Sequence, residues 1–355
     1  MTTFGHPEFA GHERVIYVAD SATGLLAIIA LHDRTLGPAV GGCRVFPYAS
    51  EDDALSDVLR LSRGMTYKNA LAGLPFGGGK SVIIADPSAK SPALIHAFGR
   101  AVDELQGQYW TGEDVNFGAH DVEVLAERTP FLLGRTKGAT NTGDPSPFTA
   151  RGVFAGMTGA LEHVFGSRDF LGRRVAIQGV GNVGLNLARL VTEAGGKVTV
   201  TDVRPESAQR AAQELGADVV ANDAIYDENC DVFAPCAMGA TIGHETIPRL
   251  QAKIVCGAAN NQLATADAGA LLLARGIAYA PDYVVNAGGI INAFGDFTGH
   301  YDVADVTRKV DAIADTVIKI LKSAEQTARP SHEVADEMAE VILATARRQQ
   351  SNSKP

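Results

Sequence analysis

The pattern of apolar and polar positions predicts that the first part of the chain mixes strands and helices. Residues 14–20 (RVIYVAD) and 24–33 (GLLAIIALHD) are apolar and rich in β-branched side chains, and the SATG segment that joins them indicates a hairpin. Residues 51–73 repeat apolar side chains at helical spacing and carry acidic residues in the first turn. A strand at 81–87 (SVIIADP) and another helix at 91–105 are expected to follow.

The second part of the chain alternates strands and helices. Residues 173–179 (RRVAIQG) and 197–202 (KVTVTD) each precede a helical pattern, and further strands are predicted in DVVAN, CDVFAPC, KIVCGAAN and IAYAPDYVVN. This repetition indicates parallel βαβ units in an open twisted sheet. Residues 303–326 place an apolar stripe on one helical face, and 331–348 predict one more helix. The stretch 134–152, rich in Gly, Thr, Pro and Ser, is interpreted as a loop near the hinge between domains.

Composition bounds the class of protein. The 355 residues are 46% hydrophobic, enough for two domains with a sizeable core. The net charge of −10 argues against a nucleic-acid or anionic-membrane partner, and no apolar run is long enough to span a membrane. The first residues lack the profile of an export signal, and the four cysteines form no CxxC pair. We therefore expect a cytoplasmic protein without a metal site.

The segment FGGGKS raises the question of a triphosphate-binding loop. Such a loop needs a glycine six positions before its lysine, and for Lys80 that position is Leu74. The loop also follows a strand and opens a helix, whereas here a helical pattern comes first and a strand comes after. A triphosphate-binding loop is therefore excluded.

A dinucleotide site is predicted in VAIQGVGNVGLNLARLVTEAGGKVTVTD. Gly179, Gly181 and Gly184 form a G-x-G-x-x-G pattern between a strand and a helix. The first glycine permits the tight turn, the second lets the backbone approach a pyrophosphate, and the third permits close helix–strand packing. Asp202, at the end of the next strand, would bind the ribose hydroxyls and repel a 2′-phosphate, which favours NAD, although the nearby Arg204 leaves NADP open.

Two lysines suggest a catalytic site in the first part. Lys68 and Lys80 are twelve positions apart and joined by a glycine-rich loop. A single lysine is most often a solvated surface charge, but Lys80 lies between glycines and an apolar strand. Two ammonium groups that converge in a cleft would lower each other's pKa, so that one could act as a general base while the other holds a carboxylate.

Six segments carry a resemblance to a known family: LGPAVGGCR, GMTYKNALAGLPFGGGKS, TGEDVN, FAPCAMGA, GAANNQL and PDYVVNAGGIIN. Together they resemble the glutamate, leucine, valine and phenylalanine dehydrogenases, over nearly the whole chain and in family order, and most of all the branch acting on apolar amino acids. The resemblance implies an α/β fold of two domains with a cleft between them. Residues 1–138, completed by 325–355, would be the substrate and catalytic domain, and residues 139–324 a doubly wound, Rossmann-type NAD domain.

The resemblance also implies residue roles. Lys68 would bind the substrate carboxylate with help from the backbone of Gly41 and Gly42. Lys80 would activate water, and Asp114 would exchange protons with the substrate amine. The apolar side-chain pocket would be formed by Val40, Gly112, Ile290 and Ala293, with Asn286 also facing the substrate. The cofactor would be bound by Gly179, Gly181, Asn182, Val183, Gly184, Asp202, Val203, Ser146, Thr149, Ala237 and Asn260.

The implied activity is the reversible, NAD-dependent conversion of an apolar L-amino acid to a 2-oxo acid and ammonia by a homo-oligomer. Glutamate-specific relatives carry a lysine at the position of Val40, so an acidic substrate would lack its charge partner. Glu113 stands where phenylalanine dehydrogenases often have proline, a departure from that branch. The alternatives are a two-domain 2-hydroxy-acid dehydrogenase, for which no histidine constellation is evident, and a catalytically silent NAD-binding paralogue.

Overall fold

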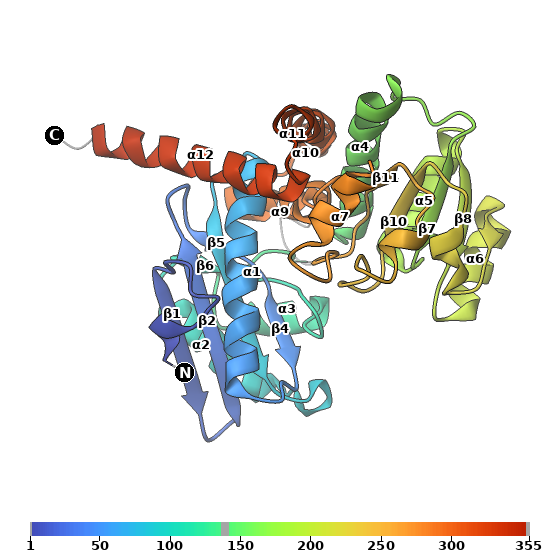
Figure 1. Cartoon of the computed structure of the whole chain (residues 1–355). Coiled ribbons are helices and arrows are strands. Elements are labelled where there is room, and N and C mark those ends of the chain that lie inside the picture. Colours follow the sequence, from blue (N-terminus) through green and yellow to red (C-terminus); the bar gives the residue numbers. More distant parts are fainter. Residues whose placement is uncertain (1, 136–141, 353–355) are drawn as a thin grey trace. The chain divides into compact units, whose positions relative to one another are not determined.

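The computed structural model describes residues 2–135 and 142–352 (Figure 1). The chain forms two compact units: unit 1 comprises residues 1–144, 293–302 and 339–355, and unit 2 comprises residues 145–292 and 303–338. The domain boundary predicted at 138/139 lies outside the described residues. Each unit contains one six-stranded sheet with helices, so the predicted α/β fold is confirmed. No helix of the described part is long and apolar enough to cross a membrane.

The sheet of unit 1 is mixed. Its strands are β1 (Arg14–Asp20), β2 (Leu25–Asp33), β3 (Ala39–Val40), β4 (Cys43–Phe46), β5 (Gly77–Ile84) and β6 (Tyr109–Trp110). Their order is β1-β2-β5-β3-β6, and β4 lies outside this order and pairs with β5. Strands β1 and β2 pair antiparallel with Arg14 opposite Leu31, which confirms the predicted hairpin. Strand β5 pairs antiparallel with β2 and parallel with β3 and β4.

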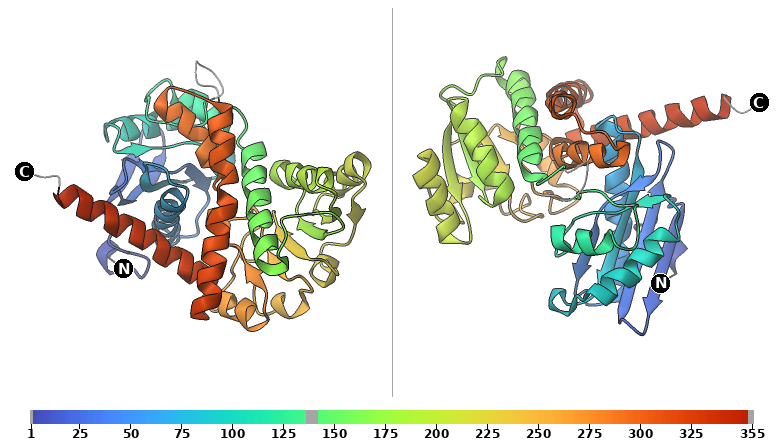
Figure 2. Two further views of the ribbon diagram at one scale, coloured as in Figure 1. Left: turned by 90° about the horizontal axis from the view of Figure 1, so that it is seen from above. Right: turned by 180° about the vertical axis from the view of Figure 1, so that it is seen from behind.

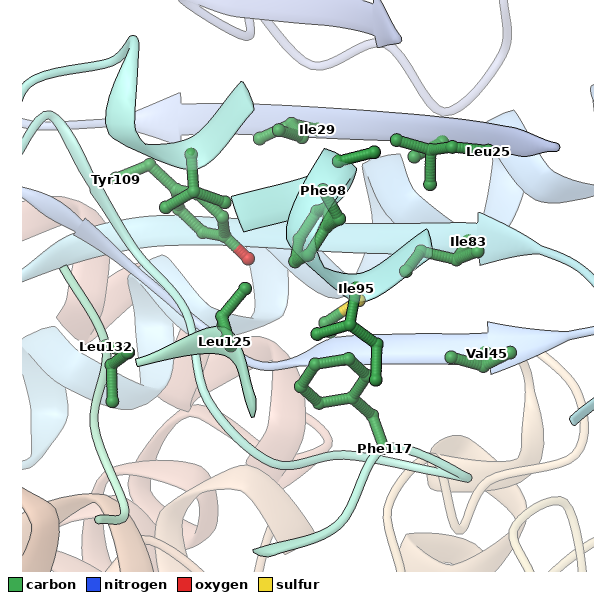
Figure 3. Close-up of a cluster of buried hydrophobic side chains, with 14 of the residues drawn as sticks. Leu25, Ile29, Val45, Ile83, Ile95, Phe98, Tyr109, Phe117, Leu125 and Leu132 are labelled. Atoms are coloured by element: carbon green, nitrogen blue, oxygen red, sulfur yellow. The ribbon is translucent and has the colours of Figure 1, made fainter. Parts of the chain in front are cut away.

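Helices cover both faces of this sheet because successive strand residues point to opposite sides. Helix α1 (Glu51–Leu71) buries Leu55 and Val58 against Ile28 on one face. On the other face, α2 (Pro92–Asp103) and α3 (Ala119–Leu125) meet the sheet in a cluster that contains Phe98 and Phe117 (Figure 3). Both long helices begin with a capping serine, as the sequence pattern predicts for a helix start.

Strand β5 begins earlier than predicted. The three glycines were expected in a loop before a strand at residue 81, but the strand starts at Gly77. A Cβ atom on Gly78 would lie 2.2 Å from the backbone nitrogen of Thr66, and one on Gly77 would lie 2.2 Å from the carbonyl oxygen of Asp33. The glycines therefore belong to the strand, where the missing side chains allow α1 and the end of β2 to approach the backbone.

The sheet of unit 2 is entirely parallel. Its strands are β7 (Arg174–Gln178), β8 (Lys197–Thr201), β9 (Asp218–Val219), β10 (Val232–Pro235), β11 (Ile254–Val255) and β12 (Ala278–Tyr279). Their order, β9-β8-β7-β10-β11-β12, is the doubly wound order of a dinucleotide-binding sheet. The order reverses between β7 and β10, so ligands of such sheets bind beyond the carboxyl ends of these strands.

The helices of unit 2 are α4 (Ser146–Phe165), α5 (Asn182–Glu193), α6 (Pro205–Leu215), α7 (Ala268–Ala274), α8 (Asp282–Val285), α10 (Val303–Asp311) and α11 (Ile313–Thr327). Helix α11 runs beside α4 (Figure 2), where a Cβ on Gly159 would lie 2.4 Å from the carbonyl oxygen of Ala314. Helices α9 (Gly288–Thr298) and α12 (Ser331–Asn352) each contribute residues to both units.

Two further element predictions need correction. The single helix expected over 303–326 is interrupted at Ala312, and Val303, placed on its apolar stripe, is 55% exposed. The loop expected over 134–152 ends at Pro145, because Ser146 begins α4. A proline immediately before a helix and another in its first turn are compatible with helix formation, so loop-forming residues at this position do not exclude a helix.

Candidate active site

The centre of the site in unit 1 is an ion pair between Lys80 and Asp114. Lys80 lies in the middle of β5, 4% exposed, and its Nζ donates a hydrogen bond to Oδ2 of Asp114. The two residues are 34 positions apart in sequence. The structure thus brings together the two residues to which the sequence interpretation gave the chemical steps.

A tight turn after β6 holds Asp114 in place. Asp114 and Phe117 exchange backbone hydrogen bonds of 3.0 Å in both directions, and Asn116 between them has a positive φ of 58°. The Asn116 side chain donates to the carbonyl oxygen of Val45, 3.0 Å away, which ties the turn to β4. The backbone N–H of Val115 donates to Oδ1 of Asp114 at 2.7 Å.

The charges around Asp114 keep it ionised. Burial alone would raise its pKa, but the positive charges of Lys80 and Arg44 outweigh that effect and hold the pKa well below its usual range. Asp114 is therefore a carboxylate at neutral pH.

Gly41 and Gly42 form the gap between β3 and β4, beside this pair. A Cβ on Gly41 would lie 1.9 Å from the carbonyl oxygen of Gly79, and one on Gly42 would lie 2.2 Å from that of Glu113. The N–H of Gly41 donates to the carbonyl oxygen of Trp110 at 3.1 Å, so this N–H already has a hydrogen-bond partner within the sheet. The N–H of Gly42 donates to none of the described backbone carbonyls. A carboxylate could therefore be bound by Gly42 more readily than by Gly41.

Lys68 lies near the end of α1 and is half-buried. Met65, one turn earlier on the helix, has its Cγ 3.0 Å from the position of a Cβ on Gly41. Residues three apart are neighbours on a helix surface, so Lys68 lies on the side of α1 that faces the glycine pair.

Three of the four predicted pocket residues belong to unit 1. Val40 is buried in β3 between β5 and β6. Gly112 follows β6, and a Cβ there would lie 2.9 Å from the carbonyl oxygen of Leu133, so backbone packing also requires glycine at this position. Ala293 lies on α9, and Ile290 lies one turn before it on the part of α9 that belongs to unit 2.

An aromatic cluster fixes the part of α9 that carries Ala293. The Phe297 ring lies 4.9 Å from the Phe76 ring and 4.9 Å from the Trp110 ring, measured between centroids. Phe294 also packs on Phe76, with a centroid distance of 5.4 Å. Because Phe76 immediately precedes β5 and Trp110 belongs to β6, the cluster holds this end of α9 on the sheet of unit 1.

In unit 2, the turn from β7 to α5 has the shape that the glycine motif predicts. Gly179 has φ of 93°, and a Cβ there would lie 2.6 Å from the Cβ of Ala237. A Cβ on Gly184 would lie 2.0 Å from the carbonyl oxygen of Gly179. Gly181, which caps α5, is open: the nearest atom to its Cβ position is Nη2 of Arg204, 3.9 Å away. The space at the helix N-terminus therefore fits a phosphate group.

Asp202 directly follows β8, and its side chain is 7% exposed. Its Oδ2 accepts the N–H of Val180 in the glycine turn, and its Oδ1 accepts the N–H of Arg204, both at 2.9 Å. Val203 next to it is 83% exposed. Asn182 and Val183 form the first turn of α5.

The remaining predicted residues of unit 2 gather around Asn286. Its Nδ2 donates to Oδ1 of Asn260 at 2.7 Å, while its own Oδ1 is buried and has no hydrogen-bond partner among the described residues. Gly288 follows two positions later, and a Cβ there would lie 1.9 Å from the carbonyl oxygen of Phe148, so no side chain fits at this position. This contact brings the Asn286 segment to the first turn of α4, which carries Ser146 and Thr149.

Comparison with known proteins decides the family. A model described as the Glu/Leu/Phe/Val dehydrogenase dimerisation domain matches residues 12–137, and one described as Glutamate/Leucine/Phenylalanine/Valine dehydrogenase matches residues 144–205 and 201–350. The chain belongs to the Glu/Leu/Phe/Val dehydrogenase family. The resemblance inferred from the sequence segments is thereby confirmed.

Relatives within the family are similar over their full length. Leucine dehydrogenase from Thermoactinomyces intermedius is 46% identical over 352 residues, covering 99% of this chain and 96% of that protein. Valine dehydrogenase from Streptomyces virginiae is 44% identical over 351 residues, covering 98% of each. The crystal structure of L-tryptophan dehydrogenase from Nostoc punctiforme matches with a TM-score of 0.84 at 42% identity, covering 95% of this chain and 97% of that one. These names agree with the predicted apolar branch.

One residue of this Glu/Leu/Phe/Val dehydrogenase site was missed by the sequence interpretation. Arg44 in β4 donates from Nε to Oδ1 of Asp114 at 3.3 Å, although it is 70 positions away in sequence. Arg44 ends the quoted segment LGPAVGGCR but was given no role. The alternation of side chains along a strand was the available signal, since Arg44 comes two positions after Gly42 and so lies on the same side of the strand.

Proposed function

We propose that the chain catalyses the reversible, NAD-dependent oxidative deamination of an apolar L-amino acid to the 2-oxo acid and ammonia. The observation that carries the proposal is the buried Lys80–Asp114 ion pair beside the side-chain-free backbone of Gly41 and Gly42. A buried lysine in contact with a carboxylate places a proton donor and a proton acceptor in one site, and acid–base catalysis on an amine uses such groups. The names of the leucine, valine and tryptophan dehydrogenase relatives support an apolar substrate.

In this proposal unit 1 holds the substrate. Lys68 and the N–H of Gly42 bind the carboxylate, which places the amino group toward Asp114. Val40, Gly112 and Ala293, together with Ile290, contact the substrate side chain. Val40 is buried and uncharged, so a substrate with a second carboxylate would lose its hydration without gaining a counter-charge.

The residues of unit 1 divide the proton transfers between them. Asp114 accepts a proton from the substrate ammonium group, because a neutral amine is needed to stabilise the iminium ion that forms when hydride leaves Cα. NAD, held by the glycine turn of unit 2, would supply the acceptor for that hydride. Lys80, once neutral, takes a proton from water as the water oxygen adds to the iminium carbon. Asp114 then returns its proton to the carbinolamine nitrogen, the hydroxyl group loses its proton to solvent, and the C–N bond breaks to give the 2-oxo acid and ammonia.

Unit 2 holds the cofactor in this proposal. The open space at Gly181 suits the pyrophosphate, and the fixed carboxylate of Asp202 suits ribose hydroxyls, which favours NAD over NADP. The buried, unpartnered Oδ1 of Asn286 is the kind of acceptor that a bound amide or hydroxyl would satisfy. The other proposed contacts are Gly179, Asn182, Val183, Gly184, Val203, Ser146, Thr149, Ala237 and Asn260.

The proposal also includes a homo-oligomer in the cytoplasm. The family model that matches residues 12–137 is described as a dimerisation domain, which supports self-association. All four cysteines are free thiols, as is usual for proteins of a reducing compartment.

The proposed function is tested first by turnover. Wild type should reduce NAD with leucine, valine, phenylalanine or tryptophan, and should oxidise NADH with the matching 2-oxo acid only when ammonia is present. Oxidation of NADH without ammonia would favour the 2-hydroxy-acid alternative, and no reaction with any of these substrates would favour a silent NAD-binding protein. Absorbance of NADH is the measurement in both directions.

The role of Lys80 is tested by substitution. Lys80→Ala should lower kcat by about 10²–10⁴-fold, because it removes the group that takes the proton from water. Lys197→Met is the matched control, since Lys197 is an exposed lysine at the start of β8 in unit 2. Near-normal turnover of Lys80→Ala would contradict the assigned role.

A further inference from the structure

The two oxygens of the Asp114 carboxylate have different partners. Oδ2 accepts from the Lys80 ammonium group. Oδ1 accepts from the backbone of Val115 at 2.7 Å and from Nε of Arg44 at 3.3 Å. Asp114 therefore faces two cations that approach from different strands, β5 and β4.

A second set of contacts holds Arg44 in this orientation. Nη1 of Arg44 donates to both carboxylate oxygens of Asp57 on α1, at 2.8 and 3.2 Å. The hydroxyl of Tyr48 donates to Oδ2 of Asp57 at 2.5 Å. The side chains of Arg44, Asp57 and Asp114 are 19%, 24% and 18% exposed, so water screens their charges only partly. The planar guanidinium can serve both carboxylates at once, which a lysine could not do with the same geometry.

The proposed reaction makes a specific demand on this arrangement. Lys80 must be neutral when it accepts a proton from water. This requires a form of the enzyme, before Asp114 takes the substrate proton, in which Lys80 is neutral and Asp114 is ionised. In that form an Asp114 paired with Lys80 alone would be a largely buried carboxylate without a cation, which is costly. Arginine does not lose its proton at any pH at which the protein is folded, so the charge on Arg44 is present throughout the cycle.

We propose that Arg44 is a positioning residue that acts through Asp114: it is the permanent counter-charge that keeps Asp114 ionised and oriented while Lys80 loses its proton. Asp57 sets the strength of that charge by partly neutralising it, and Tyr48 orients Asp57. The inference rests on the proposed function. The titratable and charged groups around Asp114 are Lys80 on β5, Arg44 and Cys43 on β4, Tyr109 on β6 and, through Arg44, Asp57 on α1.

The test is the pH profile of kcat/KM for two variants whose effects have opposite signs. In this proposal Lys80 must lose its proton beside an ionised Asp114, and the acid limb of the profile reports the loss of that proton. Arg44→Met removes a positive charge, so the pair should hold its proton more tightly and the limb should move up by about one pH unit. Asp57→Asn removes a negative charge beside Arg44, so the positive charge of Arg44 acts more strongly on Asp114 and the acid limb should move to lower pH. Loss of structure alone lowers kcat without moving the limb in opposite directions.

Further variants separate charge from shape. Arg44→Lys retains the charge and should keep the limb at its wild-type position while kcat falls by about tenfold, because the fork that contacts two carboxylates is lost. Arg34→Met is the matched control: Arg34 pairs with Glu13 at 2.6 Å in the same unit but contacts neither Lys80 nor Asp114. Its profile should be that of wild type.

Substrate binding provides a readout that does not depend on turnover. Trp110 is the only tryptophan of the chain and lies two positions before Gly112. Its fluorescence can be used to titrate 4-methylpentanoate, an apolar carboxylate that lacks the amino group. Arg44→Met should bind this probe within about threefold of wild type, because Arg44 acts on Asp114 and not on the substrate carboxylate.

The outcomes distinguish the two proposals. Suppose that wild type is active. If the acid limb is unmoved in Arg44→Met and Asp57→Asn, or moves in the same direction in both variants, the inference is overturned and the proposed function still stands. Loss of probe binding in Arg44→Met also overturns it, since Arg44 would then be a substrate ligand. A wild type that turns over no apolar amino acid overturns both. If Arg44→Met does not fold, Asp57→Asn and Arg44→Lys still decide the result.

Discussion

Both carboxylate oxygens of Asp202 accept backbone hydrogen bonds within unit 2, one from the N–H of Val180 and one from the N–H of Arg204. These bonds fix a negative charge at the end of β8, where the proposed cofactor ribose would lie. The guanidinium of Arg204 is 62% exposed, and its Nε lies 3.7 Å from Oδ1 of Asp202. In the proposed cofactor site, preference between NAD and NADP would therefore depend on a balance between these two side chains.

Asp202→Asn should shift this balance. The amide oxygen can still accept one of the two backbone hydrogen bonds, but the charge that repels a 2′-phosphate is gone. The ratio of kcat/KM for NADP to that for NAD should rise by about tenfold, which corresponds to about 1.4 kcal/mol. Adding Arg204→Ala should remove the gain, and Asp218→Asn, an exposed aspartate on β9, should leave the ratio unchanged. An unchanged ratio in Asp202→Asn would exclude Asp202 as the discriminating charge.

At the scale of residues, the sequence interpretation names residues for direct contact with the ligands, but not a residue that contacts one of these named residues. Lys80 and Asp114 were named from short motifs, and the structure joins them. Arg44 was not named, because its contact with Asp114 joins residues 70 positions apart and no local pattern encodes it. Gly112 was predicted as part of the side-chain pocket, and the close approach of the Leu133 carbonyl oxygen gives a packing reason for glycine that only the fold reveals.

At the scale of elements, the contact of α1 with β5 depends on missing side chains. Three buried polar residues of α1, Ser62, Thr66 and Asn69, face the start of the strand, and Asn69 donates to the carbonyl oxygen of Gly77 at 2.8 Å. Periodicity predicted α1 correctly, because its apolar face is regular. It placed the start of β5 too late, because glycine carries no hydrophobic signal even when it lies in the centre of a sheet.

Gly78→Ala should therefore destabilise the protein strongly. The added Cβ would lie 2.2 Å from the Thr66 nitrogen and 2.4 Å from the Ser62 carbonyl oxygen, so backbone atoms of α1 would have to move. We expect a loss of about 3 kcal/mol in the free energy of unfolding. Gly64→Ala on the same helix is the matched control, because nothing lies within 4 Å of its Cβ position. It should gain about 0.5–1 kcal/mol from helix propensity.

Urea unfolding at one fixed protein concentration measures both glycine variants. The fixed concentration matters because self-association would contribute to the apparent stability. A Gly78→Ala protein as stable as wild type would show that α1 and β5 can separate without cost, contrary to the close packing described here.

At the scale of the whole molecule, the chain passes between the two units at residues 144/145, 292/293, 302/303 and 338/339. The sequence interpretation expected one passage near residue 138 and a return near residue 325. The hydrophobic pattern has no signal for two of the passages, because α9 and α12 continue through them as unbroken helices. Assignment of a helix to one unit or another depends on long-range packing, such as the aromatic contacts of Phe297, and not on local periodicity.

The stability of unit 1 is coupled to pH through two buried histidines. His12 and His32 are 6% and 7% exposed, and their rings lie 4.8 Å apart. His12 Nε2 bonds to Ser62 Oγ at 3.0 Å, and His32 Nδ1 bonds to Thr66 Oγ1 at 2.8 Å. Burial, with a smaller contribution from the charge of His32, lowers the pKa of His12 to about 4. Both histidines are thus neutral in the folded protein at pH 7.

Acid should therefore unfold the protein partly through His12. Below pH 6.5 His12 binds a proton in the unfolded chain, whereas in the folded protein it stays neutral until about pH 4. The free energy of unfolding therefore falls over that interval, by about 3 kcal/mol at its lower end. His12→Gln keeps a polar side chain but cannot titrate, so its urea midpoint should fall less than that of wild type between pH 7.5 and 5. His244→Gln, whose ring is 59% exposed, should follow wild type. Equal pH dependence in His12→Gln and wild type would show that protonation of this buried ring does not drive acid unfolding.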